Sequence, residues 1–285
     1  MAARTTEVRL VGLNVHPLKS GAIRPVRSID VLPSGLRGDR TWMVVDADAR
    51  LVTAREAHGL FHVVADTPDT DPSVTSALRL RTTGLPDLDL DEPVGEAEPV
   101  RLFSLDLRAV AAGRDADAWL RVALRRDDVR LVWCDDPTRR TLQPGYARPG
   151  DHAAFPDAFP VTVASLASMR QLNDWIVERA LELGEDAPEP LPIERFRANL
   201  VVDGDEPFAE DRWEALTIGG TRFRVTKPVG RCVMTTIHPE TLRTAKEPIR
   251  TLARHRRVDG KTCFAANLVP EGSGTIAVGE DVEVS

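Results

Sequence analysis

The stretch ALTIGGTRFRV, residues 215–225, holds two short apolar and β-branched runs on either side of Gly219-Gly220. Paired glycines between such runs are typical of a two-residue β-hairpin turn, because the turn places its central residues at positive φ. Similar runs bounded by turn residues recur along the chain. They predict further strands over residues 8–15, 28–32, 42–45, 51–53, 61–65, 78–82, 100–102, 199–202, 232–237, 264–269, 275–278 and 282–284.

Two segments, residues 115–125 and 166–183, have the apolar spacing of helices. Asp115 and Ser165 are the expected N-caps, and Gly184 is expected to follow the end of the second helix. Residues 135–159 are rich in Pro, Gly, Asp and Arg and predict a long loop near a domain boundary. We therefore expect a mainly β protein with a few helices. A smaller β-rich domain over residues 1–130 would precede a β-barrel domain over residues 131–285.

Composition excludes several classes of function. The 285 residues include 37 Lys and Arg against 44 Asp and Glu, a net charge of -7, which argues against a nucleic-acid partner. The apolar runs are far shorter than a membrane-spanning helix requires, and the start MAARTTEVRL does not resemble a secretion signal. Three widely spaced cysteines without a CxxC pair favour free thiols over disulfides or a cysteine-held cluster. We expect a cytoplasmic protein without a membrane anchor.

Two motifs in the first half could bind an anion. HPLKSG, residues 16–21, follows a predicted strand and presents the Lys19 ammonium and the Ser20 hydroxyl. GLRGDR, residues 35–40, and TAR, residues 53–55, place Arg40 and Arg55 at the open ends of a predicted hairpin. The alternative for HPLKSG is an ordinary polar turn. The alternative for GLRGDR and TAR is that their arginines are solvated and paired with Asp39, Asp46 or Glu56.

A third motif, ERFRANLVV, spans residues 194–202. If it is extended, Arg195, Arg197 and Asn199 point to one side and the intervening Phe196 points to the other. A buried face of that kind needs an anionic ligand or acidic partners.

The fourth motif, KPVGRCVMTTIHPET, residues 227–241, contains Cys232 next to Arg231. A neighbouring guanidinium favours a thiolate, which is the form that binds soft metals. The alternative is a buried structural cysteine, the role we expect for Cys263, and the acidic residues beside Cys134 disfavour a thiolate there. A Cys–His dyad with His238 is poor, because six extended residues would separate the two side chains by about 20 Å.

Together, HPLKSG, GLRGDR, TAR, FPVTVASLASMRQLN, ERFRANLVVDGDEPFAEDRW, VGRCVMTTIHPET and GTIAVGEDVEV resemble the MOSC family. The resemblance is to its two-part members, in which a MOSC N-terminal β-barrel domain precedes the MOSC domain, as in the mitochondrial amidoxime-reducing component and its bacterial relatives. It implies a molybdenum cofactor (Mo-molybdopterin) with Cys232 as metal ligand and catalytic residue. The implied cofactor-binding residues are Lys19, Ser20, Arg40, Ser165, Arg197, Asn199 and Arg231, and proximity to the motifs adds Thr53, Arg55 and Arg195. The start of the helix after Ser165 could donate N–H groups to the cofactor's phosphate.

The resemblance also implies a function: reduction of small N-hydroxylated substrates. We expect no ferredoxin domain, no N-terminal anchor and no pyridoxal-phosphate domain in this protein, in contrast to some relatives. Electrons are therefore expected from a separate flavoprotein or iron–sulfur protein. The alternatives are a carrier that holds the cofactor without turnover and a cysteine-dependent enzyme without metal.

Overall fold

The computed structural model describes residues 8–285, which fold as two compact units. Unit 1 contains the described residues up to Asn14, Arg27–Leu32 and Val161–Ser285. Unit 2 contains Val15–Val26 and Pro33–Pro160. The chain therefore starts in unit 1 and returns to it after Pro160. The domain boundary expected at residue 130 stays a prediction.

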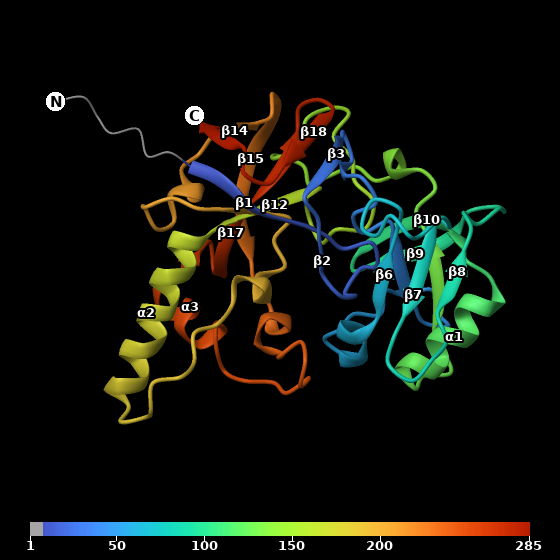
Figure 1. Cartoon of the computed structure of the whole chain (residues 1–285), viewed down its shortest axis with the longest axis horizontal. Coiled ribbons are helices and arrows are strands. Elements are labelled where there is room, and N and C mark those ends of the chain that lie inside the picture. The colour runs from blue at the N-terminus through green and yellow to red at the C-terminus, as the bar shows by residue number, and fades with distance from the viewer. Residues whose placement is uncertain (1–7) are drawn as a thin grey trace. The chain divides into compact units, whose positions relative to one another are not determined.

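Unit 1 is built on a closed barrel of seven strands, taken in the order β12-β13-β1-β19-β14-β15-β17, with β17 pairing back to β12 (Figure 1). The strands are β1 (Val8–Val15), β12 (Val161–Ser165), β13 (Leu200–Val202), β14 (Ala215–Ile218), β15 (Thr221–Gly230), β17 (Lys261–Pro270) and β19 (Asp281–Val284). The β12–β13 pair is parallel and the other pairs around the barrel are antiparallel. Closure leaves the barrel strands without an open sheet edge.

The hairpin that joins β14 to β15 forms as predicted. Gly219 and Gly220 have φ of 54° and 79°, the conformation that two-residue turns require and that glycine adopts without strain. The ladder runs in register from Ile218–Thr221 to Ala215–Arg224. The remaining strands of unit 1 are β18 (Gly274–Ala277), which pairs antiparallel with β3 (Ser28–Leu32), and the short β16 (Arg257–Val258), which pairs with β17.

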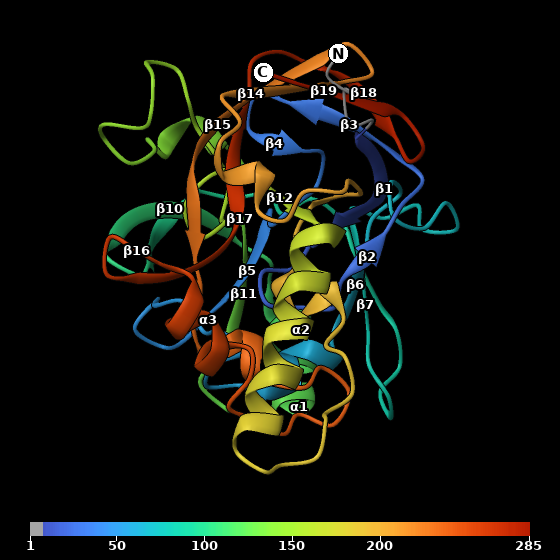
Figure 2. The ribbon, with the colours of Figure 1, turned by 90° about the vertical axis from the view of Figure 1, so that its left-hand side faces the viewer.

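Helices α2 (Leu166–Glu182) and α3 (Ile249–His255) pack beside the barrel, and α2 also packs on β12 (Figure 2). Ser165 is the N-cap of α2, as predicted, with its hydroxyl accepting from Ala167 N at 3.1 Å. Gly184 follows the helix end with φ 69°. The inner face of α2 buries Met169, Leu172, and Ile176 in one core cluster.

Unit 2 contains two antiparallel sheets. The larger has the order β5 (Trp42–Val45), β11 (Arg130–Trp133), β10 (Leu105–Ala111) and β9 (Glu98–Leu102), and the smaller joins β6 (Val64–Asp66), β7 (Leu78–Arg81) and β8 (Leu88–Leu90). Helix α1 (Arg114–Leu124) packs on β11 and β8. The short strands β2 (Arg24–Pro25) and β4 (Gly35–Leu36) also belong to this unit. The mainly β class predicted from the sequence is confirmed.

Several predicted elements differ in detail. Residues 51–53 form only a single bridge between Val45 and Leu51, and α1 starts after Gly113 rather than at Asp115. Residues 61–62 belong to the 3-10 helix η1 (His58–His62), so the predicted strand over 61–65 begins only at Val64. Local turns interrupt the loops as η2 (Pro137–Arg139), η3 (Ile193–Phe196), η4 (Ala209–Asp211) and η5 (Val233–Thr236).

The strand predicted over residues 232–237 is wrong. This segment is the 3-10 turn η5, with Cys232 as its N-cap. The hydroxyls of Thr235 and Thr236 donate to the carbonyls of Cys232 and Val233 at 3.0 and 2.7 Å. These local bonds favour a turn over a strand, although the residues are mostly β-branched.

Candidate functional site

Cys232 is half-buried. Thr235 links it to the buried Arg195 by hydrogen bonds to both residues. Thr235 N donates to Cys232 O at 3.2 Å, and Thr235 O accepts from Arg195 Nε at 2.9 Å. Arg195 is only 7% exposed and makes no ion pair within residues 8–285. Burial lowers the pKa of this guanidinium. A buried cation without a carboxylate partner is unfavourable unless an anion accompanies it.

Arg231, the residue before Cys232, is fixed by main-chain oxygens. Its Nε donates to Phe264 O at 2.8 Å and its Nη1 to Phe196 O at 3.0 Å. The guanidinium also lies 5.2 Å from the centre of the Phe196 ring, which stacks on Phe264 at 3.9 Å. These contacts hold the backbone on the N-terminal side of the thiol, while Arg195 holds the turn on its other side.

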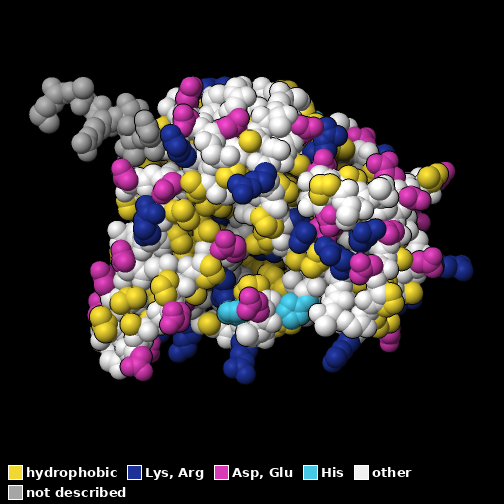
Figure 3. All heavy atoms as spheres, viewed as in Figure 1, with side chains coloured by type: hydrophobic (Ala, Val, Ile, Leu, Met, Phe, Trp, Pro, Cys, Tyr) yellow, Lys and Arg dark blue, Asp and Glu magenta, His cyan; other side chains and the backbone are white. Residues whose placement is uncertain are grey.

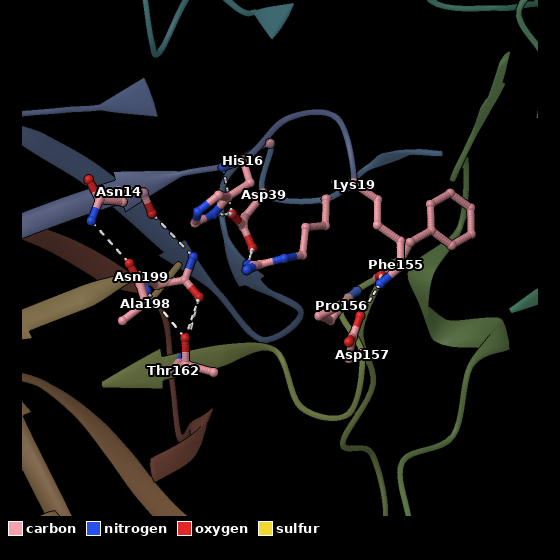
Figure 4. A network of polar contacts seen from close by, with 12 residues as sticks. Asn14, His16, Lys19, Asp39, Phe155, Pro156, Asp157, Thr162, Ala198 and Asn199 are labelled. Atoms are coloured by element: carbon pink, nitrogen blue, oxygen red, sulfur yellow. Dashed lines mark hydrogen bonds and ion pairs between the residues drawn. The ribbon is translucent and has the colours of Figure 1, made fainter. Parts of the chain in front are cut away.

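The third motif is not extended, so the predicted alternation of its side chains is wrong. Arg195 lies in η3, and Arg197 follows it with a left-handed backbone at φ 51°. Asn199 is fully buried, and its amide donates to Asn14 O at 3.1 Å and accepts from Thr162 N at 3.2 Å (Figure 4). The Asn199 side chain therefore holds β1 and β12 at this point of the barrel.

The start of α2 already has a carboxylate close to it. Glu210 is fully buried and accepts from Ser168 Oγ at 2.7 and 2.9 Å. Burial raises its pKa, and a backbone hydrogen bond from Ser165 opposes this. The role of Ser165 in binding a cofactor phosphate stays a prediction, since the structure uses this helix start for Glu210.

In unit 2, Lys19 is the centre of a basic cluster. Its side chain is 3% exposed, and its ammonium donates to Phe155 O at 2.7 Å and forms an ion pair with Asp157 (Figure 4). Burial lowers the pKa of Lys19 to about 8, against the raising effect of Asp157. The next residue, Ser20, is buried with φ 67°, and Gly21 approaches Leu18 so closely that a Cβ would lie 3.0 Å from that of Leu18.

Arg40 is oriented by a buried carboxylate. Asp39 pairs with Arg40 and accepts from the backbone N and Nδ1 of His16 at 2.8 and 3.1 Å. Burial raises the pKa of Asp39, but the Arg40 guanidinium and His16 outweigh this effect and hold that pKa at about 2. Asp39 is thus ionised at neutral pH and fixes the position of Arg40.

Arg55 contacts the same acidic residue as Lys19. Its Nη2 lies 3.6 Å from Asp157 Oδ2, and both Arg55 and Lys19 lie over the Phe103 ring, at 5.1 and 5.4 Å from its centre. Thr53 has a local role in this turn, because its hydroxyl accepts from Arg55 N at 3.3 Å and its own N donates to Glu56 at 3.1 Å. Both hydrogen bonds stabilise the turn over residues 53–56.

Arg140 and Asp157 are residues that the sequence reasoning missed. Arg140 is 4% exposed and donates to the carbonyls of Ala154, Pro156, Asp157 and Ala158. Burial lowers its pKa to about 10. It fastens the segment that carries Asp157. The one sequence signal was the unusual length of the surrounding loop, residues 135–159.

Cys134 and Cys263 are both buried, and their surroundings disfavour a thiolate. Cys134 is buried, and burial together with Asp135 raises its pKa to about 12. Cys263 lies inside β17, and burial raises its pKa as well. In the described part of the chain, no group of three His, Cys, Asp or Glu side chains could hold a metal ion. No helix among residues 8–285 has the length and apolar character needed to cross a membrane.

The predicted site residues thus form two groups, each inside one unit. Arg195, Arg231 and Cys232 are connected in unit 1, with Arg197 directly after η3, and Lys19, Arg40 and Arg55 surround Asp157 in unit 2. Acidic and basic side chains are interspersed over the face seen in Figure 3. A cofactor contact shared by both groups stays a prediction.

Comparison with known proteins places the chain in a family. Residues 149–283 match the MOSC domain, and residues 7–127 match the MOSC N-terminal beta barrel domain. Mitochondrial amidoxime-reducing component 1 of Danio rerio is 31% identical over 95% of this chain and 82% of its own length, and the Homo sapiens protein is 29% identical over 94% and 80%. The solved YUAD protein of Bacillus subtilis is 14% identical, with a TM-score of 0.41 over 98% of this chain and 95% of that one. The chain therefore belongs to the MOSC family, as a member that combines the MOSC N-terminal beta barrel domain with a MOSC domain.

Proposed function

We propose that this protein is a molybdenum-cofactor-dependent reductase of small N-hydroxylated compounds. The observation that carries the proposal is the surroundings of Cys232: a half-buried cysteine in a turn that two fixed arginines, Arg195 and Arg231, flank in the chain or contact through its backbone. The chain that presents this arrangement is similar over almost its whole length to proteins named amidoxime-reducing components.

The residues fit an anionic group bound through sulfur. A thiolate is a suitable ligand for a soft transition metal. Arg195 is a buried cation without an ion pair in residues 8–285, so an anion beside it would offset the cost of its burial. Lys19, Arg40 and Arg55 in unit 2 provide further positive charge for a phosphate. Cys232 would hold the metal.

When bound, the cofactor would supply the two-electron redox chemistry. The overall reaction breaks the N–O bond of the substrate and consumes two electrons and two protons, giving an amine or amidine and water. The chain's own residues bind and orient the cofactor, and the thiol provides a protein ligand. The two electrons would come from a separate flavoprotein or iron–sulfur protein.

The test is to produce the full chain in a host that makes the cofactor and to measure molybdenum, pterin and turnover of benzamidoxime with a chemical reductant. We expect molybdenum and turnover in the wild type and loss of both in Cys232→Ala, whose melting temperature should equal that of the cofactor-free wild type. Cys134→Ala is the matched control, and it should keep both. Turnover by Cys232→Ala would refute the ligand assignment. Cofactor without turnover in the wild type would favour a carrier.

The source of electrons has its own measurement. NADH or NADPH alone should give negligible turnover, and addition of a flavin or iron–sulfur reductase should restore it. Full turnover with NADH in protein free of other flavoproteins would contradict a separate donor. We also propose a cytoplasmic location, consistent with three free cysteines, which fractionation of the source cells would check.

A further inference from the structure

Asp157 is the point at which the cations of the unit 2 cluster meet. Its Oδ1 pairs with Lys19, and its Oδ2 lies 3.6 Å from Arg55. The surrounding protein partly desolvates the carboxylate and raises its pKa, but Lys19, Arg40 and Arg55 outweigh this and hold that pKa at about 2. Asp157 is therefore an anion that bridges two cations, as an oxygen-rich ligand such as phosphate also could.

The cluster carries more positive charge than Asp157 and Asp39 neutralise. Lys19, Arg40, Arg55 and Arg140 are four cations against these two carboxylates. The Arg140 guanidinium donates to main-chain oxygens, and the Lys19 side chain is buried. The four cations therefore leave a net positive charge on the cluster, and this charge attracts a further anion.

The Asp157 side chain lies at the surface, whereas its backbone is fixed. Arg140 fastens the segment through the carbonyls of Ala154, Pro156, Asp157 and Ala158. By contrast, 63% of the Asp157 side chain is exposed to solvent. A change of rotamer is enough to move the carboxylate out of the cluster into water, where its hydration offsets the lost ion pairs.

We propose that Asp157 is a built-in substitute for the anionic ligand: its carboxylate occupies the position between Lys19 and Arg55 until a phosphate group displaces it. The inference rests on the proposed function, because a phosphate is the anionic group that the proposed cofactor carries. Asp157 thereby keeps Lys19 charged and the cluster ordered before the cofactor binds, and it sets the affinity for the phosphate by competing with it.

The test uses the full chain produced in a host that does not make the cofactor, with inorganic phosphate as the probe in calorimetric titrations. Asp157→Asn keeps the shape and removes the competing charge. It should bind phosphate about tenfold more tightly than the wild type, because one unit charge a few ångströms from the bound anion is removed. Asp89→Asn is the matched control. Asp89 is also a half-exposed carboxylate of unit 2 paired with an arginine, Arg79, and its replacement should leave phosphate affinity unchanged.

Equal phosphate affinity in the wild type, Asp157→Asn and Asp89→Asn would overturn the inference, and so would phosphate bound at a place other than the cluster. A crystal structure of wild-type protein grown with phosphate gives a second readout that does not depend on the folding of a variant. We expect the anion between Lys19 and Arg55 and the Asp157 side chain rotated into solvent. Phosphate bound there with Asp157 unmoved, or no phosphate there, would refute displacement.

These measurements separate this inference from the proposed function. Phosphate binding requires neither molybdenum nor substrate. If Asp157→Asn binds phosphate more tightly but the loaded wild type shows no turnover, only the reductase proposal fails. If the wild type contains molybdenum and turns over benzamidoxime but Asp157 has no influence on phosphate affinity, only the present inference fails.

Discussion

Replacement of Arg140 should destabilise unit 2, and the conservative change to lysine should be no milder than the change to methionine. The Arg140 guanidinium is buried and donates to Ala154 O at 2.9 Å and Pro156 O at 2.6 Å. Two further hydrogen bonds, to Asp157 O and Ala158 O, are longer at 3.3 Å. All four fix one segment of chain, so their loss has a single local effect.

The magnitude follows from two opposing contributions. Hydrogen bonds from a charged donor contribute roughly 1.5–3 kcal/mol each, so the two short ones together with the two long ones stabilise by about 5 kcal/mol. Burial of the guanidinium lowers its pKa from 12.5 to about 10. At about 1.4 kcal/mol per pKa unit, this corresponds to a cost of about 3 kcal/mol. Arg140→Met loses the hydrogen bonds but also avoids the cost of burying the charge. The free energy of unfolding should therefore fall by about 2 kcal/mol.

Lysine and alanine give different expectations. Arg140→Lys keeps a charge in the same buried place but cannot form the planar fork of hydrogen bonds. Its free energy of unfolding should therefore be about 3 kcal/mol lower than that of the wild type. Arg140→Ala also leaves a cavity, so its free energy of unfolding should be about 4 kcal/mol lower than that of the wild type. The order of stability should be Arg, then Met, then Lys, then Ala.

Urea unfolding, followed by the fluorescence of Trp42 and Trp133 in unit 2, measures these free energies. For a domain of this size, a loss of about 2 kcal/mol lowers the melting temperature by roughly 4–8 °C. Arg108→Met is the matched control, because Arg108 also donates to a carbonyl, that of Ala97, but at an exposed site. The reasoning is refuted if Arg140→Met is as stable as that control, or if Arg140→Lys is clearly more stable than Arg140→Met.

Two further predictions concern ionisation and thiol chemistry. The pKa of Asp39 is about 2 in the folded protein, below its ordinary 3.8, so Asp39 contributes about 2 kcal/mol above pH 4 that is lost as the pH falls from about 4 to about 2. Acid unfolding of Asp39→Asn should therefore have a shallower pH dependence over that range, and an unchanged slope would contradict the assignment. In native protein without cofactor, a thiol reagent should modify one cysteine quickly, because Cys134 and Cys263 are buried with raised pKa values and Cys232 is half-exposed. Mass spectrometry of the labelled peptide checks this, and rapid labelling of Cys134 would show that its surroundings are more open than the structure indicates.

The sequence predicted best the features that depend on neighbouring residues. The hairpin of residues 215–225 needs only Gly219-Gly220 and the flanking apolar runs. The helix cap at Ser165 likewise depends on a hydroxyl within two residues of the N–H it accepts from. The segment after Cys232 was misread because β-branched residues favour strands in general, whereas the Thr235 and Thr236 hydroxyls here bond to nearby carbonyls.

Features that depend on distant residues could not be predicted in this way. The closure of the barrel pairs β12 with β17, a hundred residues later, and β1 joins strands from the end of the chain. The motifs did identify Lys19, Arg40 and Cys232 as candidates. They did not reveal Asp157 or Arg140, because the roles of these two residues arise only where the long loop meets the lysine.

The chain passes from unit 1 to unit 2 after Asn14, and buried polar side chains hold it on both sides of this point. Asn14 is the last residue of this part of unit 1, and it is held by Ala198 O and by the Asn199 amide (Figure 4). Two residues later, in unit 2, His16 is held by Asp39, which also pairs with Arg40. Both ends of this short crossing are therefore fixed by buried polar contacts. Asn199 has a structural task that needs no ligand, so loss of activity in an Asn199 variant would support contact with the cofactor only if the barrel of that variant proved as stable as the wild type.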